Sequence, residues 1–232
     1  MISIEQVNKS YGTVSVLKDI HFQFEKGRIY GIVGKNGAGK TTLFNCIMGF
    51  ESYEGIISSP WVPIKDHLGF LPTEPTFLSL LTGHEYLRLY CIARGKKYQK
   101  DERNNLFDLP LDRYASNYST GMKKKLALTA ILLQDSECYI LDEPYNGVDI
   151  QSNIMISTLI QELKRKDKLI LISSHIFSTL KETCDEILLL EDGQFQKSVL
   201  PEGFDALDQE MRSHLVNDKV QLFLNQSNFE ES

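Results

Sequence analysis

Apolar and polar residues alternate along the first part of the chain. Over residues 2–24 the apolar positions form short alternating runs, interrupted at Tyr11-Gly12, which is typical of antiparallel strands. The compact apolar stretch 28–33 then predicts a buried strand. A glycine-rich loop follows, and from Lys40 to Gly49 the apolar residues have helical spacing. The pattern therefore predicts a strand, a glycine loop and a helix, in that order.

The middle of the chain has a different pattern. Residues 54–72 predict two more short strands, broken at Pro60 and Pro63. Over residues 76–135 the apolar positions repeat at three and four, so this section is predicted to be mostly helical. We interpret it as an inserted helical subdomain.

Strands and helices alternate from Cys138 onwards. The predicted elements are strand 138–141, helix 150–164, strand 169–173, helix 176–182 and strand 187–190. Such alternation is typical of a parallel sheet with crossover helices. The combination predicts an α/β fold with a parallel sheet core, an N-terminal antiparallel β subdomain and an inserted α-helical subdomain.

The C-terminal part is short. Leu207, Met211 and Leu215 recur at intervals of four, which predicts an amphipathic helix, and a polar tail follows it. We therefore expect one domain over 1–200, with the helical insert at about 76–135, and a C-terminal helix and tail over 201–232.

Length and charge restrict the class of protein. The 232 residues carry a formal net charge of −6, which argues against broad nucleic-acid binding because such binding depends on Lys and Arg. The densest apolar run, Ile187–Leu190, is far shorter than the roughly 18 to 20 residues of a membrane-spanning helix. The N-terminus has no basic segment followed by an apolar one, so we expect a cytoplasmic location.

The glycine loop carries the first chemical motif. Residues 34–41 satisfy G-x-x-x-x-G-K-[ST], in which backbone N–H groups point at phosphate oxygens at the positive end of a helix. Lys40 would then reach the β and γ phosphates, and the Thr41 hydroxyl would ligate Mg²⁺. A tight turn with a surface lysine is the alternative. The loop lies between a predicted strand and a predicted helix, which favours phosphate binding.

Two adjacent carboxylates form the second motif. Asp142 and Glu143 end a predicted buried strand, and Pro144 stops it. Two neighbouring acids repel each other unless a cation is near, which Mg²⁺ would supply. Asp142 is the better metal partner, and Glu143 is placed to polarise a water that attacks the γ-phosphate. By itself such a pair of acids is more often part of a solvated turn. Because a phosphate-loop motif is also present, we favour a functional role for the two acids.

The helix predicted after Tyr118 breaks a rule. Ser119 is a plausible N-cap, yet the first turns contain Lys123, Lys124 and Lys125, where the helix dipole favours acids. One reading is a solvated basic face. The other is that this helix end meets an anion, with Ser119 and Gly121 offering a hydroxyl and a backbone N–H to a phosphate.

A histidine ends another strand. His175 follows the apolar run 169–174, where it could neighbour a helix cap or, at the same sheet edge as Asp142 and Glu143, reach the γ-phosphate.

Together these motifs resemble the ATP-binding subunit of an ABC transporter, a P-loop NTPase with a RecA-like core, over residues 1 to about 200. The resemblance implies ATP and Mg²⁺ as cofactors and ATP hydrolysis as the activity. It implies a Walker A loop at Gly34, Lys35, Asn36, Gly37, Ala38, Gly39, Lys40, Thr41 and Thr42. It also implies a Walker B segment with Mg²⁺-binding Asp142 and catalytic Glu143, and a catalytic switch histidine at His175.

Other positions match further family motifs. The resemblance assigns adenine stacking to Tyr11, the signature that contacts the partner subunit's ATP to Ser119, Thr120 and Gly121, and the D-loop to Asp149. Where the family usually has glutamine after a proline, this chain has Thr73, so either Thr73 or Glu74 is left as the additional Mg²⁺ ligand.

The resemblance also implies partners. A second ATPase subunit, taken to be identical, would complete each ATP site, and a separate polytopic permease, contacted through residues 73–90, would be driven by closing and opening. The chain would lie at the cytoplasmic face of the membrane, held by the permease, and the sequence favours export over import. A soluble ABC ATPase acting as an assembly or mechanical factor is the alternative. A P-loop kinase or GTPase is disfavoured, because neither needs the Ser119-Thr120-Gly121 signature.

Overall fold

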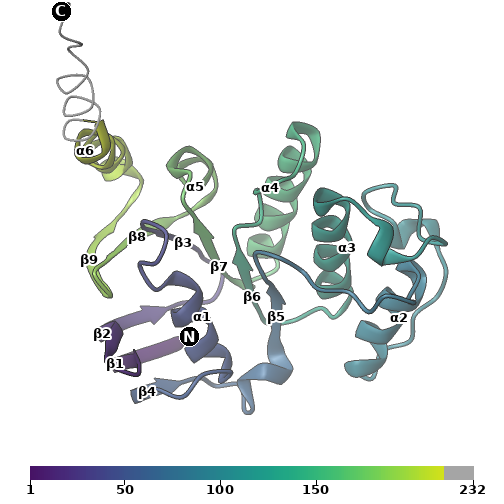
Figure 1. Cartoon of the computed structure of the whole chain (residues 1–232), viewed down its shortest axis with the longest axis horizontal. Coiled ribbons are helices and arrows are strands. Elements are labelled where there is room, and N and C mark those ends of the chain that lie inside the picture. The colour runs from purple at the N-terminus through teal and green to yellow at the C-terminus, as the bar shows by residue number, and fades with distance from the viewer. Residues whose placement is uncertain (217–232) are drawn as a thin grey trace, which may run out of the picture.

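A computed structural model describes residues 1–216, and a six-stranded sheet forms its centre (Figure 1). The spatial order of its strands is β5-β6-β7-β3-β8-β9. Their bounds are β3 Ile29–Val33, β5 Leu68–Leu71, β6 Cys138–Asp142, β7 Leu169–Ser174, β8 Glu186–Glu191 and β9 Gln194–Val199. All neighbouring strands pair in parallel except β9, which is antiparallel to β8. The predicted parallel sheet is thus confirmed.

The central strands are buried on both faces, as their continuous apolar sequences require. On β3, Ile29 and Val33 face one core and Tyr30 and Ile32 face the other. The first core contains α3 (Thr120–Leu133), α4 (Ile150–Arg165) and α5 (Phe177–Thr183). The second contains α1 (Lys40–Met48) together with the N-terminal strands. Helices α3, α4 and α5 therefore cover one face of the sheet, and α1 with the N-terminal strands covers the other.

The N-terminal strands form a separate antiparallel sheet. Its order is β2-β1-β4, with β1 at Ile2–Tyr11, β2 at Val14–Phe24 and β4 at Glu54–Ser58. Apolar side chains of β1 and β2 pack with those of α1 in the second core, which places the glycine loop between this sheet and the central one. The predicted antiparallel β subdomain is confirmed.

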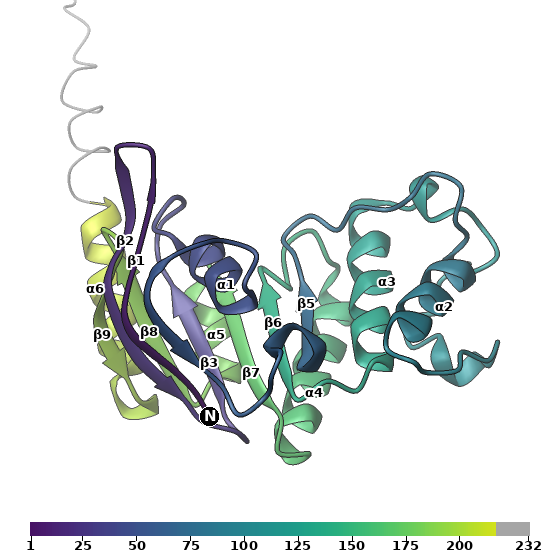
Figure 2. The ribbon, with the colours of Figure 1, turned by 90° about the horizontal axis from the view of Figure 1, so that it is seen from below.

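The helical part lies at the end of the molecule opposite β9 and α6 (Figure 2). It contains α2 (Gly83–Ala93), which packs against α3. Between them, residues 94–119 contain only short 3₁₀ turns, so this section is less helical than predicted. Gly95 has φ +65° just after α2, and the Asn105 side chain bonds both the N–H and the C=O of Leu109 in place of helical hydrogen bonds.

The last described elements are β9 and α6 (Phe204–Val216). The predicted helix is confirmed, and buried Phe204 and Leu207 join the first core. The pattern did not predict β9, because its residues are mostly polar and exposed and show no apolar alternation; β9 nevertheless pairs with β8. The predicted polar tail lies outside the described residues. In the described part of the chain, no helix combines the length and apolar content needed to cross a membrane.

Candidate nucleotide-binding and hydrolysis site

The glycine loop joins the end of β3 to the start of α1. Gly37 and Gly39 have φ of +83° and +106°, a region that favours glycine. A Cβ on Gly34 would lie 2.3 Å from the carbonyl oxygen of Leu190, so only glycine fits there. The loop thus turns tightly into α1, and the first N–H groups of that helix are directed toward its concave side.

Lys40 begins α1 and folds back under the loop. Its side chain is buried, and its Nζ donates hydrogen bonds to the carbonyl oxygens of Gly34 at 2.7 Å and Lys35 at 3.1 Å. Burial lowers the pKa of Lys40, against the opposing effect of the Glu143 and Asp142 carboxylates. The loop therefore holds an ammonium group where a phosphate would require one.

Asp142 ends β6 and is surrounded by hydroxyl groups. The Oγ1 atoms of Thr41 and Thr73 donate to Oδ2 at 2.7 and 2.9 Å, and the Ser173 hydroxyl donates to Oδ1. These hydroxyls come from α1, from the loop after β5 and from β7. A carboxylate with hydroxyl oxygens is the hard donor set that Mg²⁺ prefers, so the residues fit this ion. Exposed Glu74 does not line the pocket around Asp142, whereas Thr73 does.

Glu143 points its side chain to different partners from those of Asp142. Its backbone is left-handed, with φ +52°, and its N–H is bonded to the carbonyl oxygen of Ser173 at 3.2 Å and to the Ser173 hydroxyl at 3.0 Å. The carboxylate Oε2 lies 2.8 Å from Nδ1 of His175. The turn at Glu143 thus separates two adjacent acids into a hydroxyl-lined site and a carboxylate–imidazole pair.

These side chains share one open pocket of about 480 Å³ at the carboxyl edge of the sheet. Its lining residues are Val16, Asn36, Gly37, Gly39, Lys40, Thr41, Thr42, Thr73, Asp142, Glu143, Asn146 and His175. Lys35 and Ala38 line an adjoining pocket on the other side of the loop. Tyr11 lines neither; it is 45% exposed at the end of β1, with Lys9 Nζ 4.7 Å from its ring centroid.

The predicted signature residues lie outside this pocket. Ser119 caps α3, its hydroxyl accepting from the N–H of Met122 at 3.3 Å, and both Ser119 and Thr120 are exposed. A Cβ on Gly121 would lie 2.7 Å from the carbonyl oxygen of Gly147, so α3 packs closely against the turn after β6.

The lysines at the start of α3 have partners within the protein. Lys124 is 1% exposed and donates to the carbonyl oxygens of Glu143 at 2.7 Å and Asn146 at 2.9 Å. Lys125 pairs with Asp149 at 2.8 Å. Lys124 is therefore not part of a solvated basic face, and both of these lysines have oxygen partners within the protein.

Asp149 begins α4 as its N-cap. It accepts hydrogen bonds from the Ser152 N–H at 2.9 Å and from the Ser152 hydroxyl at 2.9 Å. The Lys125 ammonium and these bonds hold the pKa of Asp149 well below its ordinary value. The residue that the resemblance assigns to the D-loop is thus tied to both α3 and α4.

Sequence reasoning missed Ser173 and the burial of Lys124. Ser173 is a polar residue near the end of an apolar strand, at the edge where Asp142 was already expected. Lys124 lies three, four and seven residues before Ala127, Leu128 and Ile131, which are all buried. Its helical spacing therefore placed it on the core face of α3.

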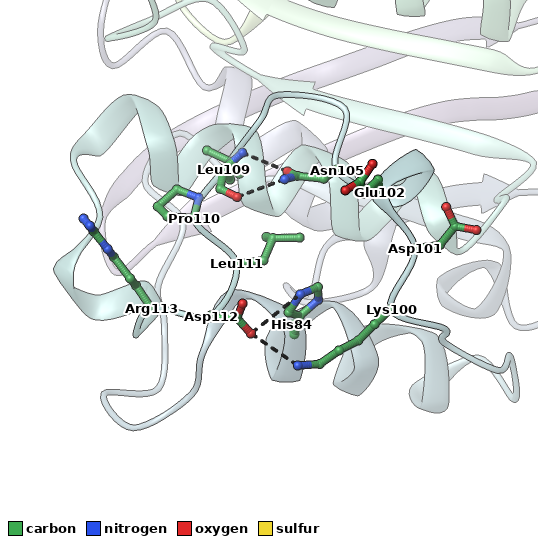
Figure 3. Close-up of a pocket in the computed structure, with 10 residues that line it drawn as sticks. All are labelled: His84, Lys100, Asp101, Glu102, Asn105, Leu109, Pro110, Leu111, Asp112 and Arg113. Carbon is green, nitrogen blue, oxygen red and sulfur yellow. Dashed lines mark hydrogen bonds and ion pairs between the residues drawn. The ribbon is translucent and has the colours of Figure 1, made fainter.

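A second pocket, of about 440 Å³, lies at the start of α2 (Figure 3). His84 Nδ1 lies 2.7 Å from the Tyr98 hydroxyl, and Asp112 Oδ1 lies 3.9 Å from His84 Nε2 and 3.3 Å from Lys100 Nζ. Burial, followed by the Lys100 charge, lowers the pKa of His84. The pocket shares no residue with the phosphate loop, and among its charged side chains Asp112 pairs with His84 and Lys100.

The fold and the phosphate-loop site define a P-loop ATPase, and comparison with known proteins specifies its family. The family model described as "ABC transporter" matches residues 17–146. The chain belongs to the ABC transporter family, as an ATP-binding subunit with ATPase activity.

Two curated relatives span most of the chain. The ABC transporter ATP-binding protein NatA of Bacillus subtilis is 32% identical over 78% of this chain and 80% of its own length. The capsule polysaccharide export ATP-binding protein CtrD of Neisseria meningitidis is 35% identical, over 83% of this chain and 91% of its own.

Solved structures agree on the fold. An ATP-binding subunit of an ABC transporter superposes with a TM-score of 0.77 at 25% identity, covering 97% of this chain and 98% of the other. A dimeric ATP-binding cassette in a post-hydrolysis state, bound to ADP and Pi, gives 0.78 at 18% identity, covering 87% and 99%. The P-loop NTPase fold expected from the sequence is thus confirmed.

Proposed function

We propose that this chain hydrolyses Mg²⁺-ATP with Glu143 as the general base and drives a separate membrane permease. The observation that carries the chemistry is the convergence of Lys40, Asp142, Glu143 and His175 around one pocket. Lys40 and the N–H groups of residues 34–42 would hold the phosphates. Thr41, Thr73 and Asp142 would hold Mg²⁺, which when bound neutralises phosphate charge.

The arrangement of Glu143 and His175 suits hydrolysis. A water molecule attacks the γ-phosphorus, the bond from that phosphorus to the bridging oxygen of ADP breaks, and the proton of the water passes to the Glu143 carboxylate. Because His175 Nδ1 faces Glu143 at 2.8 Å, its Nε2 is left to face the γ-phosphate. Orienting the base and contacting the phosphate are thus combined in one side chain.

The ATP site would be completed by a second copy of the chain. Ser119 and Thr120 are exposed and lie outside the pocket of their own subunit, as residues that serve a partner would. Beside Asp149, Ile150 and Ile154 are 81% and 64% exposed at helical spacing, an apolar surface suited to burial between subunits. A solved structure of the same fold is a dimer. Within each subunit, Tyr11 would stack on the adenine of bound ATP.

The permease would dock on residues 73–90. This segment begins at the Mg²⁺ site with Thr73 and presents Leu78 and Leu80, which are 65% and 76% exposed. One chain segment thus connects the site of hydrolysis to an exposed apolar surface. The permease would hold the subunit at the cytoplasmic face of the membrane.

Export is the proposed direction. A relative that is 35% identical is named for capsule polysaccharide export, and another for bacitracin transport. A soluble ABC ATPase that acts as an assembly factor is less favoured, because the relatives named here are transporter subunits.

Co-purification tests the transport role. The full chain should be recovered from membranes in detergent together with a polytopic protein, and the double variant Leu78→Asp/Leu80→Asp should lose it. Leu200→Asp is the matched control, because Leu200 is 52% exposed near α6, at the other end of the molecule. Recovery with a soluble partner alone would contradict the proposal.

A further inference from the structure

Lys124 is a charged side chain in an unusual place. It lies in the second turn of α3 and is 1% exposed, although lysine is rarely buried unless paired. Desolvation lowers its pKa, and the charges of Glu143, Asp142 and Glu74 act in the opposite direction. Its ammonium donates to two backbone carbonyl oxygens, those of Glu143 and Asn146, at 2.7 and 2.9 Å.

Those carbonyl groups belong to the turn that directs the Glu143 side chain. Glu143 has a left-handed backbone, with φ +52°, which a non-glycine residue keeps only when its surroundings impose it. Ser173 fixes the N–H side of this residue, and Lys124 fixes its carbonyl side. The Asn146 N–H also bonds to the Glu143 carbonyl oxygen, at 3.2 Å.

The orientation of the Glu143 carboxylate follows from this backbone. Oε2 faces His175, and the backbone dihedrals at Glu143 set the direction in which its side chain leaves the turn. Lys124 itself does not line the phosphate-loop pocket. Its hydrogen bonds therefore act on the site through the turn, and its charge acts on Glu143 and Asp142 through space.

We propose that Lys124 is a positioning residue for ATP hydrolysis, whose ammonium holds the turn 143–146 so that Glu143 faces the reacting water. The inference rests on the proposed role of Glu143 as the general base. It explains why a lysine occupies the first turns of α3, where the helix dipole disfavours a cation: the two carbonyl oxygens of the turn compensate it.

Steady-state kinetics of Lys124 variants in the full chain tests the inference. Lys124→Met keeps an unbranched side chain, one bond shorter than that of lysine, and removes every donor, so kcat should fall at least about tenfold while the Kd for ATP stays within about twofold. Lys124→Gln keeps N–H donors on a side chain that is one bond shorter and reaches one carbonyl oxygen, so its kcat should lie between those of Lys124→Met and the unchanged protein.

Lys168→Met is the matched control. Lys168 is also buried, at 9% exposure, and pairs with Asp135 and Glu137 before the start of β7, at the sheet edge opposite the pocket. Its loss should lower the melting temperature and leave kcat unchanged. If Lys124→Met does not fold, Lys124→Gln decides, and a kcat equal to that of the unchanged protein would overturn the proposal.

Two further outcomes would overturn it. One is a Lys124→Met protein with unchanged kcat; the other is an equal loss in Lys124→Met and Lys124→Gln, which would point to packing or charge instead of hydrogen bonding. Glu143→Gln measured in parallel separates this inference from the role of Glu143. If Glu143→Gln hydrolyses ATP at the normal rate, the proposed function fails. If Glu143→Gln is inactive but Lys124→Met hydrolyses ATP at the normal rate, only the role of Lys124 fails.

A double variant supplies the remaining check. Because Lys124 would act through Glu143, adding Lys124→Met to Glu143→Gln should lower the single-turnover rate no further. A further multiplicative loss would mean that Lys124 acts independently of Glu143 and would contradict the proposal.

Discussion

Nδ1 of His175 lies 2.8 Å from Oε2 of Glu143, joining the residue after β7 to the residue after β6. The pairing depends on neighbouring parallel strands, since Asp142 is in register with Ser173. It leaves the second carboxylate, that of Asp142, to the hydroxyl-lined site. The geometry thus gives two adjacent acids different partners, which suits the proposed division between catalysis and metal binding.

His175→Ala should lower kcat by roughly 100-fold, because it removes the partner that orients Glu143, and should weaken ATP binding far less, because Lys40 and the glycine loop would still hold the phosphates. Steady-state hydrolysis with calorimetric titration of ATP checks both values. A kcat equal to that of the unchanged protein would show that the His175–Glu143 contact has no part in turnover.

Thr73→Val should raise the Mg²⁺ concentration for half-maximal hydrolysis by about 10-fold. Valine keeps the shape of threonine but removes the hydroxyl that lies 2.9 Å from Asp142 Oδ2. Glu74→Gln is the matched control and should leave the Mg²⁺ dependence unchanged, because exposed Glu74 does not line the pocket. The reverse result would transfer the metal role from Thr73 to Glu74.

ATP affinity should fall as the pH rises. The fall should begin below pH 10.5, the ordinary pKa of lysine, because burial lowers the pKa of Lys40. The ammonium that attracts phosphate is present below the folded-state pKa and is lost as the pH rises through it. Calorimetric titration from neutral to alkaline pH measures the trend. Lys40→Arg, which stays charged throughout, should bind ATP more weakly at neutral pH but with a flatter pH dependence.

An ATP affinity that is constant with pH in the unchanged protein would contradict this assignment. Lys40→Ala should weaken binding at every pH, and an unchanged affinity in that variant would remove Lys40 from the phosphate site.

Ser173→Ala should destabilise the protein by about 1–3 kcal/mol, because it removes the donor to Asp142 Oδ1 and leaves two buried groups with one partner fewer. Denaturant unfolding measures the change in the free energy of unfolding. Exposed Ser178→Ala, on α5, is the control and should change it little. Equal effects in the two variants would argue against a structural role for the Ser173 hydroxyl.

The sequence predicted the elements that carry the phosphate loop and the two acids. Apolar runs marked β3, β6 and β7, and the glycines marked the turn into α1. Because the carboxyl ends of parallel strands meet at one edge, Lys40, Asp142 and His175 were expected together, and the structure places them there.

Features that depend on tertiary contacts were not predictable in the same way. The β9 strand has a polar sequence, and its pairing with β8 decides its conformation. The lysines of α3 suggested a solvated or anion-facing surface, whereas Lys124 is buried on backbone carbonyl oxygens. Tyr11 does not line the pocket, so its stacking on adenine remains a prediction. The domain boundaries also remain predictions.

The central claim is that Glu143 is the general base for ATP hydrolysis in this subunit. Glu143→Gln keeps the shape of the side chain but cannot accept the proton of the attacking water. Single-turnover hydrolysis, measured together with ATP binding and the oligomeric state, tests it most directly. We expect a loss of roughly 100-fold or more in rate, unchanged ATP affinity and accumulation of an ATP-bound dimer. Turnover close to that of the unchanged protein would contradict the account.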